Sequence, residues 1–318
     1  MPLAGQIAVV TGASKDIGKG IAIQLGKAGC TVYVTGKKPS HSEICRGNHP
    51  SKLEQVAQEI DECGGKGIAV YVDHSDMGDI RQFFERIDRE NKGRLDILVN
   101  AFAAVKTLAK NLETQKNFYE TDPDIWDEVN NVGLRNHYYC SVYAARIMAK
   151  RRTGLIVMIS SFGGLRYTYN IPYGVGRQAN DRMADDMAQE LRASNVTVVS
   201  LWPGFVKTEH VRRMTISSKI LNIRTVRALE AGESVYYPGK AVVALAKDPN
   251  RLRKTGRILI TADLGAEYGF KDVDGRDPPN FRSLSVQLRD LGYDHLASWI
   301  PCSIKIPGWL LWLSSNRL

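Results

Sequence analysis

Short runs of apolar and β-branched residues recur along the chain, and longer amphipathic stretches separate them. Seven such runs cover residues 7–10, 31–35, 68–72, 95–99, 155–159, 197–201 and 257–260. Near-continuous apolar runs of this length are typical of strands that are buried on both faces, as in a parallel sheet. The pattern therefore predicts an α/β protein with a doubly wound parallel sheet.

The stretches between these runs have the periodicity of helices that pack one face on a sheet. In residues 17–28, Ile17, Ile21 and Leu25 fall on one stripe, and Gly29 follows as a terminator. No internal repeat or Pro-rich linker divides the chain before residue 265 or so. We predict a Rossmann-type single domain over residues 1–270, with a surface loop over residues 37–51 and a C-terminal extension over residues 271–318.

Composition and charge narrow the class of protein. The five cysteines are scattered and odd in number, and the first residues lack the basic and apolar regions of a signal peptide. These features predict an intracellular, reduced protein. The formal charge of +9 comes from dispersed cations rather than a basic stripe with interleaved aromatics, so we predict a solvated basic surface and no nucleic-acid partner.

One segment has a spacing that could suit a metal. His41, Cys45 and His49 recur every four residues, as ligands on a helix would. Pro, Gly and Asn around them favour a loop, and a closed zinc site needs a fourth ligand that the sequence does not offer. We therefore predict that the protein holds no metal.

The first predicted strand runs into a glycine-bearing turn that precedes a helix. The turn reads Thr-Gly-Ala-Ser-Lys-Asp-Ile-Gly over residues 11–18. A strand, a turn and a helix in this order can cradle a pyrophosphate, because the helix N-terminus offers free N–H groups and the positive end of a dipole. The second strand ends at Gly36 and is followed by Lys37 and Lys38, with no carboxylate for a ribose 2′-hydroxyl. Cations there suit a 2′-phosphate, so we predict NADP(H) in preference to NAD(H).

A tyrosine and an arginine four residues apart lie beyond the fifth strand. On a helix, Tyr173 and Arg177 would share one face, where the cation stabilises the phenolate form of the tyrosine. Two serines, Ser160 and Ser161, precede Tyr173 by thirteen and twelve residues. These side chains are the candidates for acid–base chemistry on a carbonyl oxygen.

Taken together, these motifs resemble the short-chain dehydrogenase/reductase family over residues 5–265. Gly12 and Gly18 match the first and last glycines of its Thr-Gly-x-x-x-Gly-x-Gly turn, and residues 173–177 match its Tyr-x-x-x-Lys signature except at the last position. Asn100 matches the start of its Asn-Asn-Ala-Gly element, and residues 203–208 match its Pro-Gly-x-x-x-Thr element. The resemblance implies a Rossmann-type oxidoreductase.

The resemblance also implies roles for single residues. Tyr173 would be the proton donor, Ser161 would bind the substrate oxygen, and Arg177 would take the place of the lysine. The spacing of thirteen that is usual in the family would select Ser160, but the glycine at position 164, three residues after Ser161, favours Ser161. The implied cofactor-binding residues are Gly12, Ser14, Lys15, Ile17, Gly18, Lys37, Asp73, Asn100, Tyr173, Arg177, Pro203, Gly204, Val206 and Thr208. Residues 209–235 would form a substrate lid.

Three positions depart from the family pattern. Asp16 replaces the middle glycine and brings a negative charge to the phosphate turn, with Lys15 beside it to offset part of the repulsion. Arg177 keeps the charge of lysine but does not deprotonate, so it is a poor proton relay. Gly133 stands where the family has a catalytic asparagine; Asn130 or Asn131 could substitute, or could be polar residues on a helix face.

At finer grain, residues 126–135 and 271–276 resemble one subgroup of the family. That resemblance implies an NADPH-dependent reductase of ketones and aldehydes, including steroid-like and xenobiotic carbonyls, that is associated with the endoplasmic reticulum; a cytoplasmic location is the alternative. Relatives of this fold also pair through helices starting near Asp124 and Tyr173, which implies a homodimer or homotetramer. The alternative function is a slow or inactive nucleotide-binding scaffold or sensor, which Asp16 and Arg177 would favour.

The C-terminal extension is rich in aromatic and aliphatic residues. Trp299, Trp309 and Trp312 lie in its last twenty residues beside aliphatics and the cations Lys305 and Arg317, and prolines interrupt it. No apolar run approaches the ~20 residues of a bilayer span. The segment is predicted either to lie in a membrane interface, as a peripheral contact, or to pack on the protein's own cleft or on a partner subunit.

Overall fold

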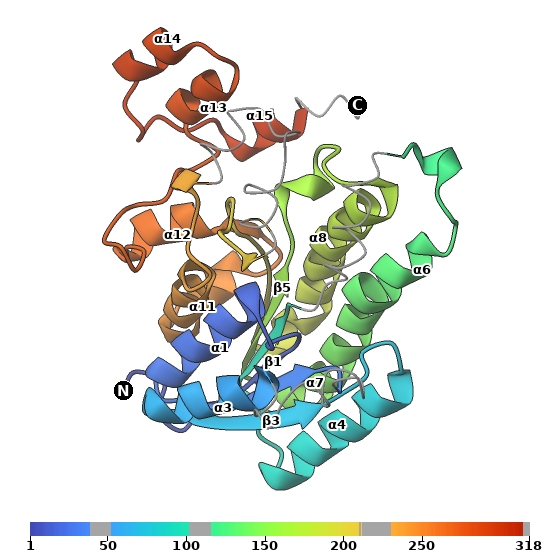
Figure 1. Cartoon of the computed structure of the whole chain (residues 1–318). Helices are drawn as coiled ribbons and strands as arrows, with labels where there is room; N and C mark the ends of the chain where they lie inside the picture. Colours follow the sequence, from blue (N-terminus) through green and yellow to red (C-terminus); the bar gives the residue numbers. More distant parts are fainter. Residues whose placement is uncertain (39–51, 102–115, 210, 212–229, 314–318) are drawn as a thin grey trace.

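The computed structural model describes residues 1–38, 52–101, 116–209, 211 and 230–313. Its centre is a parallel sheet of seven strands in the order β3-β2-β1-β4-β5-β6-β7 (Figure 1). The strands are β1 (Ile7–Val10), β2 (Thr31–Gly36), β3 (Lys66–Tyr71), β4 (Ile97–Asn100), β5 (Gly154–Ile159), β6 (Val196–Trp202) and β7 (Ile258–Ile260). Each predicted apolar run corresponds to one of them, so the predicted doubly wound α/β fold is confirmed.

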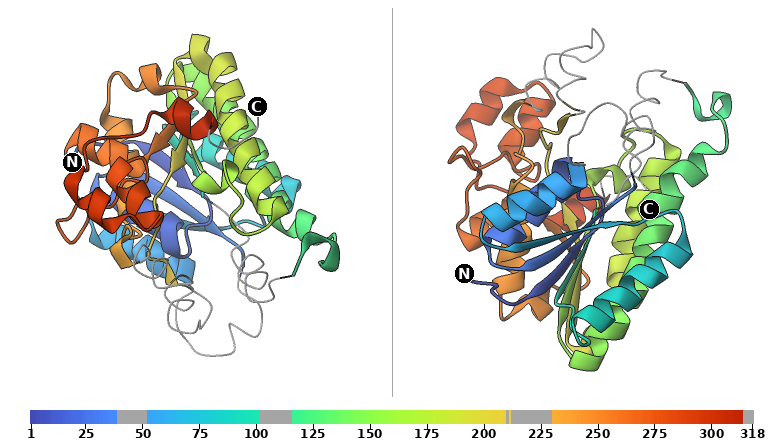
Figure 2. Two further views of the ribbon diagram at one scale, coloured as in Figure 1. Left: turned by 90° about the horizontal axis from the view of Figure 1, so that it is seen from above. Right: turned by 60° about the horizontal axis from the view of Figure 1, so that its bottom comes forward.

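Helices cover both faces of the sheet, which explains why the strands are apolar throughout. Along β1, Ala8 and Val10 pack into one buried cluster and Val9 into the other, on the opposite face. The first cluster includes side chains of α1 (Asp16–Lys27), α3 (Lys52–Glu62), α11 (Tyr237–Lys247) and α12 (Thr261–Tyr268). The second includes side chains of α4 (Met77–Glu90), α7 (Asn136–Arg151) and α8 (Ile171–Leu191). Figure 2 shows these two helical layers from above and with the bottom of the molecule turned forward.

The strand order reverses between β1 and β4, and this reversal positions the site. In open α/β sheets, ligands bind beyond the carboxyl ends of the strands at the switch point, where the connecting segments diverge. The β1–α1 turn, the end of β4 and the ends of β5 and β6 all lie at that edge, because the sheet is parallel. Most of the predicted site residues lie on these segments. Lys37 and Asp73 instead follow β2 and β3, and Tyr173 and Arg177 lie on α8.

The C-terminal extension is folded as three short helices and packs on the domain. These are α13 (Leu284–Asp290), α14 (Asp294–Trp299) and α15 (Gly308–Leu313), which gather beyond α12 in Figure 1. Two segments of the extension pair, because the Leu284 amide donates to the Ile304 carbonyl at 2.9 Å and the Ile306 amide donates to the Arg282 carbonyl at 2.7 Å. Within the described ranges, no helix combines the length and the apolar character that a bilayer crossing requires.

Candidate active site

Two hydroxyl groups meet at the carboxyl ends of the strands. Ser161 follows the end of β5 and begins a 3₁₀ turn over Phe162–Gly164, with its Oγ accepting the Gly163 amide at 3.2 Å. Tyr173 lies in the first turn of α8, where Asn170 caps the helix by accepting the Tyr173 amide at 2.9 Å. The Ser161 Oγ and the Tyr173 phenol oxygen are 2.7 Å apart. A carbonyl oxygen that replaced this mutual hydrogen bond could accept one from each group.

The neighbouring serine points elsewhere. Ser160 is buried, and its hydroxyl donates to the backbone carbonyl of Arg177 at 3.0 Å. It thus joins the end of β5 to the body of α8. Of the two serines that the sequence offers, Ser161 is the one that lies beside Tyr173.

Arg177 lies one helical turn from Tyr173, and its charge is held in place by two contacts. The guanidinium carbon lies 5.0 Å from the centre of the Tyr173 ring, within cation–π range. Its Nη1 donates to the Ile159 carbonyl at 2.7 Å, at the last residue of β5. The arginine thereby ties α8 to β5 through its head group, which a lysine ammonium on a shorter, unforked side chain would not reproduce.

The glycine turn after β1 has the tight geometry that its sequence predicts. Gly12 has a φ of +66°, a left-handed conformation that suits glycine. A Cβ on Gly18 would lie 2.4 Å from the Gly12 carbonyl oxygen, so any larger residue would force the turn away from α1. Ser14, Lys15 and Ile17 are half-buried on this turn and on the start of α1.

Asp16 replaces the middle glycine of the turn and keeps a backbone conformation that suits glycine. Its φ is +51°, which a residue with a Cβ adopts at a cost of about 1 kcal/mol. Its Oδ1 accepts the backbone amide of Glu209 at 2.9 Å, and the Lys15 ammonium lies 4.0 Å from Oδ2. The side chain therefore joins the phosphate turn to the segment that follows β6.

The cations after β2 meet an acid at the end of β3. The Lys37 ammonium lies 3.3 Å from the Asp73 carboxylate, and the lysine side chain is 70 % exposed. The amide and hydroxyl of Ser75 also donate to Asp73, and with Lys37 they hold the pKa of the Asp73 carboxyl below its ordinary value. Lys37 and Asp73 thus form one charged pair at the rim of the site.

Asn100, at the end of β4, is fully buried. Its amide nitrogen donates to the Ser141 hydroxyl at 2.9 Å, and its Oδ1 has no hydrogen-bond partner in the described part of the chain. The next residue, Ala101, donates its amide to the Thr11 hydroxyl at 3.0 Å. The end of β4 is thereby fixed to the start of the glycine turn.

The segment after β6 rests on a buried acid that the sequence did not reveal. Val206 pairs with Glu233, and the Gly204 amide donates to Glu233 Oε1 at 2.8 Å. The Thr261 hydroxyl donates to the same oxygen, while Oε2 is buried with no partner among the described residues. Burial raises the pKa of the Glu233 carboxyl to about 7 despite these donors, and the charge of Asp272 adds to the rise.

Two further predicted cofactor-binding residues, Pro203 and Thr208, lie in the same segment after β6. Pro203 is buried and Thr208 is half-buried. The Thr208 amide donates to the Val206 carbonyl at 2.8 Å, and the Thr208 hydroxyl accepts the Val211 amide at 3.2 Å. Of the predicted lid, residues 210 and 212–229 lie outside the described residues.

A second, half-buried acid, Asp181, lies one turn beyond Arg177 on α8. Its Oδ1 accepts the Ser200 hydroxyl at 2.5 Å and the Trp202 indole N–H at 2.9 Å. Burial raises the pKa of this carboxyl to about 6, against the lowering effect of these donors. Neither Asp181 nor Glu233 belongs to a sequence motif, and acidic residues are ordinarily solvated, so the sequence carried no signal for these two contacts.

A π-helical turn lies where the family has its catalytic asparagine. This turn, Asn131–Arg135, joins α6 (Ile125–Asn130) to α7, and such turns are frequent at functional sites. The Asn180 amide donates to the Gly133 carbonyl at 2.9 Å, and Asn130 donates to the Pro172 carbonyl at 3.3 Å, beside Tyr173. Asn130 is buried and Asn131 half-buried, and the bond to Pro172 joins Asn130 to the first turn of α8.

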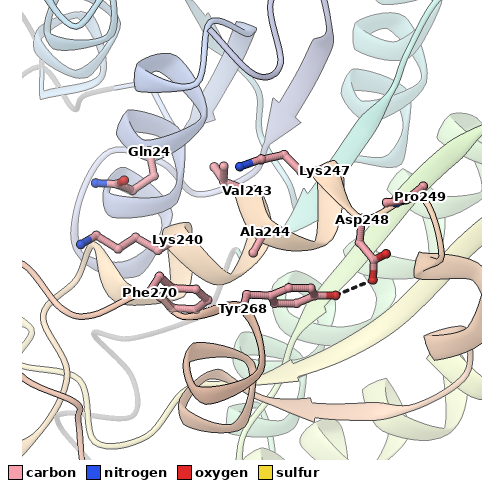
Figure 3. Close-up of a pocket in the computed structure, with 9 residues that line it drawn as sticks. All are labelled: Gln24, Lys240, Val243, Ala244, Lys247, Asp248, Pro249, Tyr268 and Phe270. Carbon is pink, nitrogen blue, oxygen red and sulfur yellow. Dashed lines mark hydrogen bonds between the residues drawn. The ribbon is translucent and has the colours of Figure 1, made fainter.

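A surface pocket lies away from this site. It has a volume of about 440 Å³ and is lined from α1, α11 and the region around α12 by Gln24, Lys240, Val243, Ala244, Lys247, Asp248, Pro249, Tyr268 and Phe270 (Figure 3). No predicted site residue lines it.

The candidate metal ligands of the sequence, His41, Cys45 and His49, lie outside the described residues. In the described part of the chain, no group of three His, Cys, Asp or Glu side chains is placed to hold a metal.

The fold and the site define a class of protein. The model of the short chain dehydrogenase family matches residues 6–218, and the chain belongs to this family. Dehydrogenase/reductase SDR family member 1 of Homo sapiens is 45 % identical over 323 residues, which cover 99 % of each chain. The NADPH-dependent aldehyde reductase 2, chloroplastic, of Arabidopsis thaliana is 29 % identical over 65 % of this chain and 74 % of its own.

A solved structure gives the same result. A metagenomic short-chain oxidoreductase in complex with NADP superposes with a TM-score of 0.59 at 25 % identity, over 78 % of this chain and 93 % of its own. Family membership makes the chain an oxidoreductase with a fold that binds nicotinamide cofactors.

Proposed function

We propose that the protein reduces ketone or aldehyde carbonyls, of the steroid-like or xenobiotic type, with NADPH. The observation that carries this proposal is the 2.7 Å contact between the Ser161 hydroxyl and the Tyr173 phenol. Both groups lie at the carboxyl edge of the sheet, where this fold binds its ligands. Two hydroxyl donors within reach of one oxygen are what a developing alkoxide needs.

The residues of the glycine turn fit a dinucleotide. Gly18 allows α1 to approach Gly12 closely, so the N-terminus of α1 can face a pyrophosphate. Lys37, largely exposed at the end of β2, supplies a cation for a ribose 2′-phosphate. The NADP of the structural neighbour and the NADPH in the name of the Arabidopsis relative support this choice for the present chain. Asn100 brings to the same edge a buried amide oxygen that has no partner among the described residues.

When bound at the glycine turn, NADPH would supply the hydride that reduces the carbonyl carbon. The Tyr173 phenol gives its proton to the carbonyl oxygen, which completes the alcohol and leaves Tyr173 as a phenolate. A proton from solvent then restores the phenol. Ser161 donates a hydrogen bond that holds this oxygen beside Tyr173. The guanidinium of Arg177, against the ring of Tyr173, stabilises the phenolate that the transfer leaves behind.

Arg177 also sets a limit on the rate. A guanidinium does not release a proton, so the proton that restores Tyr173 must come by another route. Asp16 adds a negative charge to the turn that would face phosphates. These two residues support the alternative function, a nucleotide-binding scaffold or sensor with slow or absent turnover.

The test is oxidation of NADPH by the parent protein with a panel of ketones and aldehydes. Tyr173→Phe should lower kcat by about a hundredfold or more, and Ser161→Ala by a similar factor. Tyr167→Phe is the matched control, because Tyr167 is 76 % exposed. An active parent that Tyr173→Phe leaves unchanged would rule out the proposed acid. NADPH binding without turnover of any carbonyl would favour the scaffold.

We also propose that the C-terminal extension makes a peripheral contact with membranes. It exposes Trp299, Trp309 and Leu310 together with Leu296 and Tyr293. Tryptophan, tyrosine and aliphatic side chains of this kind favour the interface between lipid headgroups and acyl chains. The formal charge of +9 favours anionic lipid.

A further inference from the structure

An apolar cluster joins the C-terminal extension to the loop that carries Ser161. Its buried members are Leu165, Trp202, Ile260, Ala262 and Leu311, and Phe162, Phe281 and Ile306 pack around them. Three of these eight residues belong to the extension, and three come from the strands β6 and β7 and from α12. The other two, Phe162 and Leu165, belong to the turn that follows Ser161.

Phe162 is the member of this cluster that is adjacent to Ser161 in the chain. Its ring centre lies 5.2 Å from that of Phe281 and 6.2 Å from that of Trp202. The guanidinium of Arg166 lies 5.4 Å from the same ring. The ring is thus held on several sides, and Phe281 supplies one of them from the extension.

One carboxylate of the domain binds three donors of the extension. Asp263, in α12, accepts hydrogen bonds from Asn280 at 2.7 Å, Arg282 at 2.8 Å and Lys305 at 2.6 Å. These three donors flank Phe281 and Ile306. The anchoring therefore sets the position of the side chains that reach the cluster.

The turn after Ser161 transmits this packing to the hydroxyl. The Gly164 amide donates to the Ser161 carbonyl at 3.0 Å, and the Leu165 amide donates to the Phe162 carbonyl at 2.9 Å. The Ser161 Oγ itself accepts the Gly163 amide. A shift of Phe162 would therefore move the backbone that aims Ser161 at Tyr173.

We infer that the C-terminal extension is a positioning element for Ser161. Phe281 and Leu311 hold Phe162 in its cluster, and Phe162 fixes the turn that presents the Ser161 hydroxyl to the substrate oxygen. The inference rests on the proposed function, in which Ser161 binds that oxygen. It assigns to the extension a part in catalysis that is separate from any contact with membranes.

The experiment uses the full chain and the variants Phe281→Ala and Leu311→Ala. Each should lower kcat roughly 10- to 100-fold, because small displacements of an orienting group have effects of this size. The dissociation constant of NADPH, measured by its fluorescence, should change less than about twofold, since none of the eight cluster residues belongs to the glycine turn. The matched controls are Leu296→Ala and Trp299→Ala, at extension residues that are 58 % and 87 % exposed; both should keep the parent kcat.

A second measurement does not depend on activity. Hydrogen–deuterium exchange should rise about tenfold or more at the amides of Gly163, Gly164 and Leu165 in Phe281→Ala, with β5 and α8 unchanged. If Phe281→Ala does not fold, Phe281→Leu keeps an apolar side chain there and should give the same local change. Unchanged exchange in this turn would overturn the inference, and so would faster exchange throughout β5 and α8, which would indicate general destabilisation.

The two measurements also separate this inference from the proposed function. If the parent binds NADPH but turns over no carbonyl, the proposed function fails, while the exchange at Gly163 to Leu165 still decides whether the extension positions the turn. If exchange rises in the turn but kcat stays at the parent value, the positioning is not catalytic and the inference fails. A loss of kcat together with local exchange supports it.

Discussion

The guanidinium of Arg177 lies over the ring of Tyr173 at 5.0 Å, and its Nη1 donates to the Ile159 carbonyl at 2.7 Å. Both contacts of the guanidinium are therefore structural: one is with the face of the Tyr173 ring and the other with the end of β5. A planar fork suits these two contacts together, while a compact ammonium would leave one of them. The rate of the proposed reaction therefore depends on how well arginine at this position replaces the lysine of the family.

Arg177→Lys should raise kcat for carbonyl reduction by about tenfold, because an ammonium can exchange protons and a guanidinium cannot. The measurement is steady-state NADPH oxidation with the preferred carbonyl of the panel. Arg182→Lys, at an exposed position of the same helix, should leave the rate unchanged. A lower kcat in Arg177→Lys would show that the bond to Ile159 matters more than proton exchange. A gain of several orders from an undetectable parent would favour the scaffold.

Asp16→Asn should bind NADPH about 3- to 10-fold more tightly at low salt, because it removes a charge near the phosphates. Asparagine tolerates a φ of +51° and keeps an oxygen that can accept the Glu209 amide, so stability should change by less than about 0.5 kcal/mol. Fluorescence titrations at two salt concentrations measure the effect. An affinity that is equal in both proteins would mean that Lys15 already neutralises the charge.

Asp16→Ala separates backbone strain from charge. Alanine also removes the negative charge, but it loses the bond to Glu209 and tolerates the left-handed region poorly. The free energy of unfolding of this variant, measured in urea, should therefore be lower than that of the parent by about 1 to 2 kcal/mol. A variant as stable as Asp16→Asn would show that the turn relaxes without strain.

Lys37→Asp should reverse the cofactor preference. A carboxylate at the end of β2 repels a 2′-phosphate and can accept a ribose hydroxyl, so the ratio of kcat/KM for NADPH to that for NADH should fall at least about tenfold. Lys66→Asp, at an exposed position where β3 begins, lies at the opposite edge of the sheet and is the control. An unchanged ratio in Lys37→Asp would exclude Lys37 from cofactor selection.

The fold followed from local patterns, whereas parts of the site depend on contacts that no local pattern encodes. Buried apolar runs indicate strands and predicted the sheet, and the glycines predicted the turn at Gly12 and Gly18. The sequence suggested charge repulsion at Asp16, but it could not show that the side chain accepts an amide 193 residues away. The Arg177 bond to Ile159 is likewise set by how α8 packs on β5.

Two acids and the extension illustrate the same limit. Glu233 and Asp181 look like solvated residues in the sequence. The packing of β6, α8 and α12 buries Glu233 and leaves Asp181 half-buried, with Ser200 as its donor. The extension was predicted to lie in a membrane interface or to pack on protein. The structure buries Leu311 and leaves Trp299 and Trp309 exposed, so its two sides have different surroundings.

Removing the exposed tryptophans should weaken lipid binding without altering the enzyme. The parent should co-sediment with vesicles that contain anionic lipid, and Trp299→Ala with Trp309→Ala should reduce the bound fraction severalfold, because each ring contributes a few kcal/mol of interfacial burial at most. Trp126→Ala is the control, since Trp126 is 44 % exposed on α6. Equal binding of parent and double variant would remove the membrane proposal and leave the positioning of Ser161 untouched.

Glu233 should make the protein less stable as the pH rises. Its pKa is about 7 in the folded protein and 4.5 as an ordinary glutamate. Below pH 4.5 both states hold the proton. Between pH 4.5 and 7 the unfolded chain releases the Glu233 proton and the folded chain keeps it, so the free energy of unfolding falls as the pH rises. Above pH 7 both states release the proton, and the free energy of unfolding falls no further.

Glu233→Gln removes this titration while keeping an oxygen that can accept the Gly204 amide and the Thr261 hydroxyl. Relative to the parent, the variant should therefore gain on the order of 2 to 3 kcal/mol of unfolding free energy between pH 4.5 and 8, measured with urea. Asp181 titrates in the same direction but is present in both proteins, so it cancels in the difference. Glu230→Gln, at an exposed glutamate, should show no such gain. A parent–variant difference that stays constant with pH would mean that Glu233 is ionised in the folded protein, and that the segment after β6 rests on a buried charge.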